Sequence, residues 1–282
     1  MMTVPLDLSH KELLSPKFKQ LALNISEYSF ANCYLFRNTH AFEVIFDEEV
    51  FLRGKTYDDK TYLMPIFDVT KSSPSYLKKM LNQAEIFFPI PEKWEEHFVK
   101  AGFSTAFLEN DSDYIYKLEK LRELNGRHLS SKRNLIAQFH EHYEAEAFPL
   151  GQKHQEDALK VLEVWMAGQN DAVEKTDYAA CREAILLLDV LELFGTIYYV
   201  DQKPVAFMLG EALNPEMFVL HFAKADINYK GIYQYMHQAF AIALDGRFKF
   251  SNWEIDLGVE GLKQFKSSYE PDFLVKKIRV HR

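Results

Sequence analysis

The amino-acid sequence predicts an α+β (α/β mixed) fold of two similar tandem halves, each with a mixed central sheet flanked by helices. One observation is that a strand, a helix and further strands occur in a similar order at residues 84–118 and 252–280. A second is that apolar and aromatic strand patterns alternate with helical spacing along the whole chain. A third is the turn pair Asn125-Gly126, followed by a long amphipathic segment from Ser130. A length of 282 residues suits two domains.

These observations predict an N-terminal domain over 1–125, a connecting helix over 126–150 and a C-terminal domain over 151–282. The elements expected in the first half are a hairpin of 42–46 and 50–53, a strand 61–67, a helix after 74, a strand 85–90, a helix 92–101 and a strand 114–118. Those expected in the second half are helices 157–168 and 176–191, a hairpin of 194–200 and 204–213, a strand 217–223, a helix from 232, a strand 252–257, a helix 260–268 and a strand 273–280.

Composition and charge limit the function classes. The apolar content of 48% and aromatic content of 15% indicate packed cores, and the formal charge of −8 disfavours nonspecific binding to nucleic acid or acidic membranes. Two local segments are basic: residues 117–133 and the last twenty residues each carry six basic against two acidic side chains. Two distant cysteines and the polar first twenty residues predict a cytoplasmic chain without disulfides, signal peptide or membrane span.

The stretch from Met217 to Phe240 is central to the functional interpretation. It reads as a buried strand, a loop containing Lys230-Gly231, and an amphipathic helix. The unpaired N–H groups and the positive dipole end of such a helix can hold a phosphate or carboxylate. Lys230 would add charge, and Gly231 would allow close approach. The alternative is an ordinary loop in which the glycine only makes a turn.

Four motifs carry a family resemblance. Residues 26–37 (SEYSFANCYLFR), 121–143 (LRELNGRHLSSKRNLIAQFHEHY), 227–241 (INYKGIYQYMHQAFA) and 252–271 (NWEIDLGVEGLKQFKSSYEP) occur in order over nearly the whole chain. Together they resemble a bacterial family classed with the C-terminal domain of phosphatidylglycerol lysyltransferase. The resemblance implies a tandem GNAT-like acyltransferase fold, related to enzymes that move an aminoacyl group from tRNA onto lipid or peptidoglycan. The lysyltransferase has an additional membrane-spanning portion, and the sequence shows none.

The resemblance also implies a donor-binding loop with the pattern Gln/Arg-x-x-Gly-x-Gly/Ala. The matching segment places Asn228 at the first position, Gly231 at the glycine and Tyr233 at the second small position. Tyr233 would crowd the pyrophosphate of CoA, which weakens an acetyl-CoA interpretation and suits a different donor. Lys230 is either a charge for the donor or a solvated side chain.

The same resemblance makes Tyr269 a candidate acid for the leaving group, because many GNAT enzymes carry a Tyr near the end of the last helix. Leu262 and Phe265 replace the Asn and Ala of that pattern. The alternative is a Tyr packed at the helix end. The corresponding helix of the first half carries Phe98, which has no hydroxyl, and that half lacks a glycine loop. We therefore expect the first half to be a scaffold.

Other polar residues are candidates with structural alternatives. Glu254 and Asp256 alternate on the expected strand 252–257, so both would face one side and one could deprotonate an acceptor amine. His221 lies in the central strand, where a hydrogen-bonded core histidine is favoured over a base. His140 and His142 are two residues apart on a helix, which does not suit a shared metal site.

Lys132, Arg133 and Asn134 follow the turn between the halves. They could bind an anionic donor or a tRNA phosphate, or they could pair with acidic residues to fix a domain contact. Ser29, Asn32 and Arg37 are expected to cap and pack the fold.

The sequence thus predicts a transferase of acyl or aminoacyl groups that takes acyl-CoA or aminoacyl-tRNA as donor and uses an amine or hydroxyl acceptor without a metal. The partner is an anionic small-molecule or tRNA donor, and the oligomeric state is left open. The alternative is a GNAT-shaped protein that binds an anionic ligand without turnover.

Overall fold

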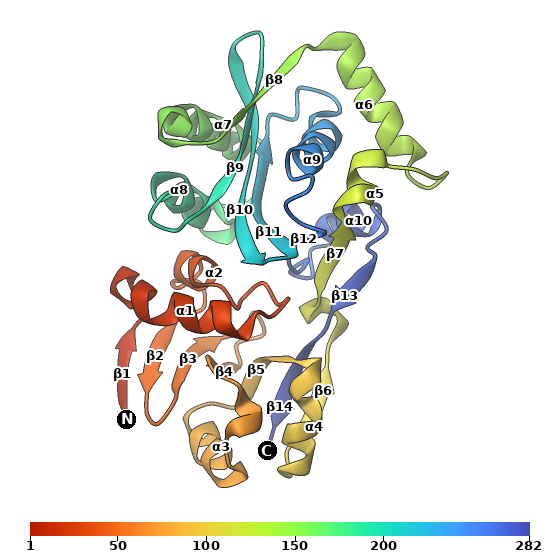
Figure 1. Cartoon of the computed structure of the whole chain (residues 1–282). Coiled ribbons are helices and arrows are strands. Elements are labelled where there is room, and N and C mark those ends of the chain that lie inside the picture. Colours follow the sequence, from red (N-terminus) through yellow and green to blue (C-terminus); the bar gives the residue numbers. More distant parts are fainter. The chain divides into compact units, whose positions relative to one another are not determined.

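Two seven-stranded mixed sheets form the framework of the protein, in a computed structural model that describes residues 1–282 (Figure 1). The first sheet has the strand order β1-β2-β3-β4-β5-β14-β6, and the second, taken from its β8 edge, has β8-β9-β10-β11-β12-β7-β13. The orders correspond position by position, which confirms the tandem arrangement expected from the sequence. In both sheets the fourth and fifth strands are parallel and the hairpins before them are antiparallel.

The strands of the first sheet are β1 (Met2–Pro5), β2 (Glu43–Phe46), β3 (Val50–Lys55), β4 (Thr61–Pro65), β5 (Ile86–Pro91), β6 (Ser104–Phe107) and β14 (Lys277–His281). Those of the second sheet are β7 (Asp113–Lys117), β8 (Ala145–Pro149), β9 (Phe194–Val200), β10 (Lys203–Asn214), β11 (Met217–Ala225), β12 (Phe250–Asn252) and β13 (Phe273–Val275). The helices are α1 (Lys11–Leu21), α2 (Phe30–Leu35), α3 (Pro74–Met80), α4 (Glu92–Lys100), α5 (Leu118–Glu123), α6 (Ser130–His142), α7 (Gln155–Ala167), α8 (Tyr178–Leu186), α9 (Ile232–Ala243) and α10 (Glu260–Ser267).

The sixth strand of each sheet comes from the other half of the chain. β14 lies between β5 and β6 and is antiparallel to both, and β7 is antiparallel to β12. The two compact units accordingly combine distant segments: unit 1 is 1–114, 254–263 and 273–282, and unit 2 is 115–253 and 264–272. The division into 1–125, 126–150 and 151–282 stays a prediction about domains.

Local signals in the sequence account for several helix boundaries. Ser73 caps α3 by accepting a hydrogen bond from the backbone N–H of Tyr76, and Pro74 occupies the first helical turn. Ser29 caps α2 by accepting from the N–H of Asn32, as expected. In α4, Trp94 and Phe98 lie four residues apart and are both buried.

Three predicted elements have wrong boundaries. The single strand expected at 273–280 is two strands, since β13 ends at Val275 in the second sheet and β14 begins at Lys277 in the first. The strand expected at 252–257 is confined to Phe250–Asn252, because Glu254 and Leu257 adopt positive φ angles of 58° and 56°, which break the extended backbone. The helix expected over 176–191 is α8, which begins at Tyr178 and ends at Leu186; Asp177 is its capping position, and Thr176 Oγ1 accepts from the Tyr178 N–H.

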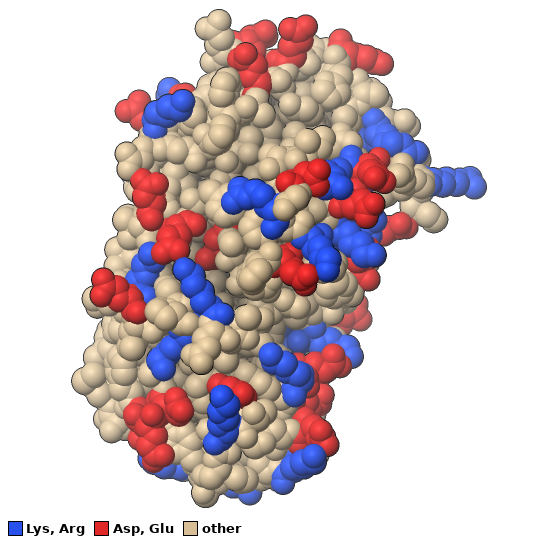
Figure 2. Space-filling view, viewed as in Figure 1, with Lys and Arg blue, Asp and Glu red and all other residues tan.

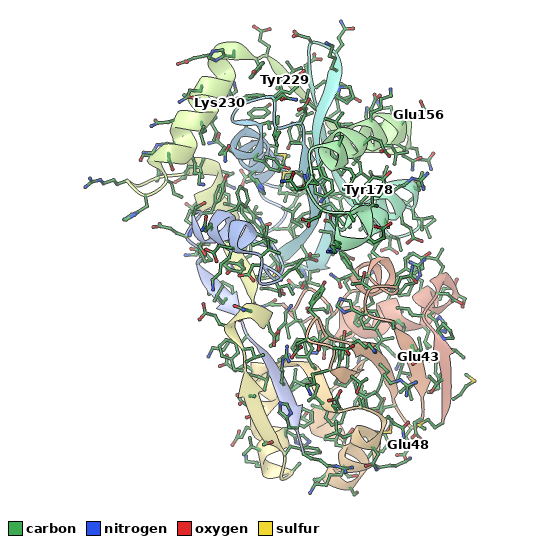
Figure 3. The ribbon with its side chains drawn as sticks, turned by 180° about the vertical axis from the view of Figure 1, so that it is seen from behind. Glu43, Glu48, Glu156, Tyr178, Tyr229 and Lys230 are labelled. Carbon is green, nitrogen blue, oxygen red and sulfur yellow. The ribbon has the colours of Figure 1, made fainter.

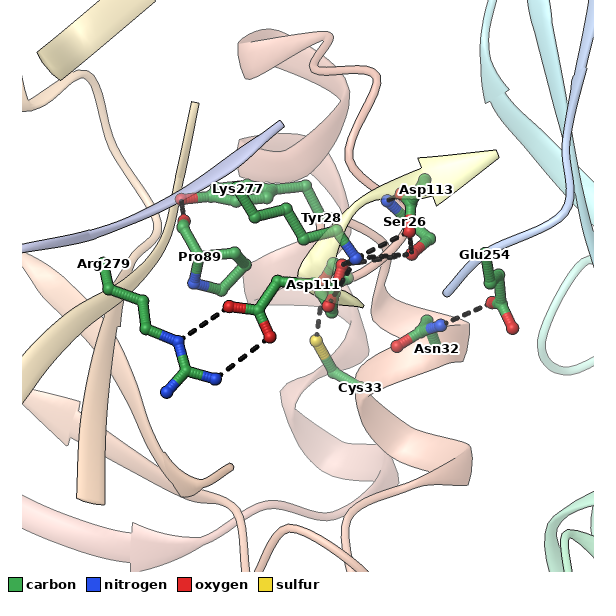
Figure 4. Close-up of polar contacts among 11 residues, drawn as sticks. Ser26, Tyr28, Asn32, Cys33, Pro89, Asp111, Asp113, Glu254, Lys277 and Arg279 are labelled. Atoms are coloured by element: carbon green, nitrogen blue, oxygen red, sulfur yellow. Dashed lines mark hydrogen bonds and ion pairs between the residues drawn. The ribbon is translucent and has the colours of Figure 1, made fainter. Parts of the chain in front are cut away.

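A buried ionic cluster joins β14 to the rest of unit 1 (Figure 4). The Lys277 ammonium lies 2.6 Å from Asp113 Oδ1 and 2.6 Å from Glu27 Oε2. Ser26 donates to Asp113 from its backbone N–H and from its hydroxyl. Burial opposes the charged form of Lys277, but the two carboxylates outweigh burial and raise its pKa. β14 is therefore fixed by charge as well as by its strand pairing.

None of the ten α-helices combines the length and the apolar character that crossing a membrane requires. Cys33 and Cys181 are both buried, and neither forms a disulfide.

Candidate functional site

The parallel strands β11 and β12 separate soon after they meet. They pair over Met217–Val219 and Phe250–Asn252, whereas β11 continues to Ala225 and the chain leaves the sheet at Trp253. On its other side, β11 has a register irregularity opposite Leu209 and Gly210, typical of a β-bulge. Openings at the carboxyl ends of parallel strands, and bulges, are recurrent positions for ligand sites in α/β proteins.

Aromatic side chains from several elements meet at the point where β12 ends. Trp253 has its ring 4.2 Å from that of Tyr116 on β7, 4.3 Å from that of His237 on α9 and 5.1 Å from that of Tyr269. Phe265 of α10 stacks on Trp253 with a centroid separation of 6.1 Å. We refer to Trp253, Tyr116, His237, Phe265 and Tyr269 as the Trp253 cluster, all of which lies in unit 2.

Two polar atoms of this cluster are buried without any hydrogen-bond partner: the Tyr269 hydroxyl oxygen and His237 Nδ1. The residues are 1% and 4% exposed, and their rings are 5.8 Å apart. Leaving such groups unsatisfied costs about 1–3 kcal/mol each, so native proteins seldom do so without a ligand, a water or a functional reason. Burial raises the pKa of Tyr269, which keeps the phenol protonated at neutral pH.

Two lysines flank the Trp253 cluster. Lys132 reaches it from α6, donates to Ser268 Oγ at 2.6 Å and places its ammonium 4.5 Å from the centre of the Tyr269 ring. Burial lowers the pKa of Lys132. Lys266 of α10 donates to the carbonyl of Trp253. The structure thus brings together Lys132 and Tyr269, which the sequence named from separate motifs, and adds His237.

His237 makes unit 2 sensitive to acid. Burial, with the nearby ammonium groups of Lys132 and Lys266, lowers the pKa of His237 to about 3 from an ordinary 6.5. Because the folded pKa is the lower one, the unfolded chain binds the proton first, so stability is lost as pH falls below about 6.5. We expect the free energy of unfolding to be about 2 kcal/mol smaller at pH 5 than at pH 7 from this group alone. Urea unfolding at pH 5 and at pH 7 measures this difference in the free energy of unfolding. His237→Phe should make the difference smaller, and an unchanged difference would show that another group causes it.

The other residues of the linker motif have separate environments. Arg133 donates to the carbonyls of Leu124 and Gly126, so its guanidinium holds the turn before α6. Asn134 is exposed on α6. Of the three residues, only Lys132 contacts the Trp253 cluster.

Much of the positive charge at 117–133 is balanced within unit 2. Lys120 pairs with Asp272 at 2.9 Å, and Arg122 pairs with Asp245. On the face shown in Figure 2, basic and acidic side chains are interspersed. These contacts favour a structural role for Lys120 and Arg122.

The loop before α9 is packed against α6. Gly231 has a φ of 88°, and a Cβ atom there would lie 2.3 Å from the Leu135 carbonyl oxygen. This glycine is therefore required by its backbone conformation and by close helix packing. Asn228 donates twice to the Asp226 carboxylate, from its backbone and its side chain. Lys230 is exposed at the end of this loop, beside Tyr229 (Figure 3).

Tyr233, at the second small position of the expected loop pattern, points into unit 2. Burial raises its pKa to about 12, and its ring lies 6.2 Å from that of Phe265. Nearby, Lys224 at the end of β11 pairs with both carboxylate oxygens of Asp177 at 2.6 and 2.8 Å and lies 3.5 Å from the centre of the Trp165 ring. The cofactor role of Asn228, Lys230, Gly231 and Tyr233 stays a prediction.

Glu254 and Asp256 belong to unit 1 and have different partners. Glu254 accepts from the Asn32 side chain at 2.8 Å (Figure 4). Asp256 is buried, accepts from the Tyr114 hydroxyl at 2.7 Å and from the N–H of Gly258 at 2.9 Å. The expectation that they alternate on one strand is wrong, since both follow the end of β12. Their catalytic role stays a prediction.

The histidines outside the cluster have local partners. His221 Nε2 lies 3.0 Å from Glu211 Oε1, which confirms the favoured hydrogen-bonded core histidine. His142 Nδ1 lies 2.8 Å from the carbonyl oxygen of Gln138, and the His140 ring packs 5.3 Å from that of Tyr235. No group of three or more His, Cys, Asp or Glu side chains is arranged to hold a metal ion.

The sequence interpretation missed His237, whose imidazole carries the second unpartnered polar atom of the site. It lies on the same helical face as Met236 and Phe240, and all three are buried. A polar residue within the apolar stripe of a helix was the available signal. Its lack of a partner depends on packing with α10 and the chain after β12, which are distant in sequence.

Comparisons with known proteins agree with this architecture. The family model described as phosphatidylglycerol lysyltransferase, C-terminal, matches residues 18–281. An uncharacterized protein of Mycoplasmoides gallisepticum is 26% identical over 194 residues, which cover 66% of this chain and 61% of that relative. A solved protein of unknown function from Bacteroides thetaiotaomicron has a TM-score of 0.85 at 22% identity, covering 99% of both chains. L-PGS from Bacillus licheniformis has a TM-score of 0.64 at 12% identity, covering 100% of this chain and 93% of the other.

Proposed function

Since the chain belongs to the phosphatidylglycerol lysyltransferase C-terminal family and has a tandem GNAT-like fold, we propose that it transfers an acyl or aminoacyl group to an amine or hydroxyl acceptor. Family and fold together point to this class of transferase. The observation that carries the proposal is the buried, unpartnered Tyr269 hydroxyl in the Trp253 cluster, next to the opening of β11 and β12. A donor whose leaving atom reached this hydroxyl would supply the missing partner.

The proposed step is direct attack. The acceptor nitrogen or oxygen forms a bond to the donor carbonyl carbon, and the bond from that carbon to the leaving oxygen or sulfur breaks. The leaving atom takes the proton of the Tyr269 hydroxyl, and the proton lost by the acceptor passes to solvent or to a base, from which the phenolate is reprotonated. The Lys132 ammonium, 4.5 Å from the Tyr269 ring, favours the transient negative charge on that residue.

Of the two donor classes, aminoacyl-tRNA suits this geometry better than acyl-CoA. The main chain of α6 occupies the space beside Gly231 through which a phosphate would approach the loop. The bulky and largely buried Tyr233 stands at the second small position of the expected loop pattern. The loop therefore lacks the small residues that would let a CoA pyrophosphate approach it closely. A thiol has a pKa of about 8.5 and can leave without a proton, whereas a ribose alkoxide is far more basic and needs an acid such as Tyr269.

A binding protein without turnover is the second candidate. Two departures from the donor-binding pattern favour it. The main chain of α6 fills the space beside Gly231, and the Asp226 carboxylate already accepts the N–H groups of Asn228 in that loop. Under this candidate the Trp253 cluster would be a packed core.

Donor consumption and acceptor mass distinguish the two candidates. The protein is incubated with acetyl-CoA, a long-chain acyl-CoA or lysyl-tRNA, and with phosphatidylglycerol vesicles or small amines as acceptors. We expect lysyl-tRNA to be consumed faster than in buffer, with an acceptor product heavier by one lysyl residue. Thermal stabilisation by a donor, with no product from any donor–acceptor pair, would leave only the binding function.

Lys230 tests the predicted anion contact at the loop. Its side chain is exposed and forms no ion pair in the structure, so removing it should leave the fold unchanged. We expect Lys230→Ala to weaken binding of the consumed donor about 3- to 10-fold at 50 mM NaCl, and less at 300 mM, because salt screens an exposed charge. Lys203→Ala, at an exposed lysine that begins β10, is the matched control. Equal donor affinity of Lys230→Ala and the parent would exclude this contact.

A further inference from the structure

Unit 1 contains a cavity of about 330 Å³ that the transfer chemistry does not use. Its lining includes three lysines and two aromatic side chains: Lys17, Lys71, Lys93, Phe67 and Trp94. The volume is at the lower end of the range for small-molecule sites.

The cavity occupies the place in the first sheet that the β11–β12 opening has in the second. β4 and β5 are parallel and pair only through Tyr62 with Ile86 and Leu63 with Phe87. The chain after β4 contributes Phe67 and Lys71 to the lining, and the first turn of α4, directly after β5, contributes Lys93 and Trp94. The cavity therefore lies beyond the carboxyl ends of two parallel strands, a recurrent ligand position.

The charges on the cavity wall favour an anion. None of the ammonium groups of Lys17, Lys71 and Lys93 forms a close ion pair, but Lys71 and Lys93 interact electrostatically with Asp68 and help to lower the pKa of its carboxyl group. Of the two carboxylates in the lining, that of Asp68 accepts from the N–H and the hydroxyl of Thr70, at 3.1 and 2.7 Å. Glu49 supplies the other. Three ammonium groups thus face two carboxylates around this concave surface, and the excess of positive charge favours a bound anion.

Two aromatic side chains, Phe67 and Trp94, line the cavity. Trp94 is 4% exposed and Phe67 is 9% exposed, so both are fixed by packing and present only part of their rings. Trp94 packs edge-on against Tyr28 at 6.4 Å, and the Lys93 ammonium is 5.9 Å from the Trp94 ring. A ligand with a phosphate near the lysines and a flat or apolar body on these rings would satisfy both features.

We propose that this cavity binds a small phosphate ester, with the phosphate held by Lys71 and Lys93 and the body of the ligand against Trp94 and Phe67. Unit 1 would then be a binding module as well as a scaffold. The inference does not depend on the proposed transfer reaction, because all of the lining residues lie in unit 1.

Titration of the full chain tests this site. Adenosine monophosphate, glycerol 3-phosphate and inorganic phosphate are the probes, and adenosine and glycerol are the uncharged controls, each followed by calorimetry and tryptophan fluorescence. We expect adenosine monophosphate to bind with a Kd below 1 mM and at least tenfold tighter than adenosine. Trp94→Phe should remove the fluorescence change and keep calorimetric binding within about threefold.

Matched variants assign the contact. The double variant Lys71→Ala/Lys93→Ala should bind adenosine monophosphate at least tenfold more weakly than the parent. Lys78→Ala, at an exposed lysine of α3, should bind it as the parent does. Tyr269→Phe should also bind as the parent does, which separates this site from the transfer reaction. The proposal is overturned if no phosphate probe binds below 10 mM, or if the double variant retains the parent affinity.

Discussion

Replacing Tyr269 by phenylalanine is expected to lower the rate of group transfer by about 10²- to 10⁴-fold while leaving the fold intact. The hydroxyl is buried and makes no hydrogen bond in the structure, so the substitution removes no interaction that stabilises the folded chain. The aromatic contacts with Trp253 and His237 are retained by the phenyl ring. Activity and stability should therefore respond differently to this change, which a purely structural tyrosine would not show.

Tyr198→Phe is the matched control, since Tyr198 is another buried tyrosine of unit 2 and its hydroxyl donates to the Met236 carbonyl at 3.1 Å. We expect it to cost about 1 kcal/mol of stability and to keep most of the transfer rate. Single-turnover rates and urea unfolding of both variants give the comparison. Parent-like transfer by Tyr269→Phe would show that this hydroxyl is not the acid.

Lys277→Ala is expected to reduce the free energy of unfolding by about 3–5 kcal/mol. The substitution would leave the carboxylate of Asp113, which is fully buried, without its cation, and would also remove the partner of Glu27. Urea unfolding followed by circular dichroism measures the change.

The neighbouring residue supplies the control. Lys276 is exposed and pairs with Glu92 on the surface, so Lys276→Ala should have only a small effect. Lys277→Met combined with Asp113→Asn should recover part of the loss, because it removes both charges of the Lys277–Asp113 pair and leaves only Glu27 without its cation. If Lys277→Ala were as stable as Lys276→Ala, the buried cluster would have no stabilising role.

The sequence predicted the fold where its signals are local. Long apolar strands such as β10 and β11 and the amphipathic helices α4 and α9 were recognised from periodicity. The short strands β1, β6 and β8 were not, because their residues are mostly exposed and lack a clear alternation. β12 was predicted too long because the positive φ of Glu254 depends on its surroundings rather than on residue type.

The candidate site shows the same division between local and distant signals. Tyr269 and Lys132 were identified from motifs, and the structure places them in contact. His237 required knowledge of which helices pack together. Gly231 was singled out as part of an anion-binding loop, which stays a prediction; its close neighbour is the backbone of Leu135, a contact that spacing along the chain does not reveal.

The exchange of β7 and β14 between the sheets affects how the protein is made. β5 pairs with β14, whose residues are synthesised about 190 positions later, so the first sheet stays incomplete during most of translation. Until then the apolar edge of β5 has no permanent neighbour and can pair with other chains. We therefore expect ribosome-bound chains that stop before residue 277 to require chaperones, and separately expressed halves to aggregate.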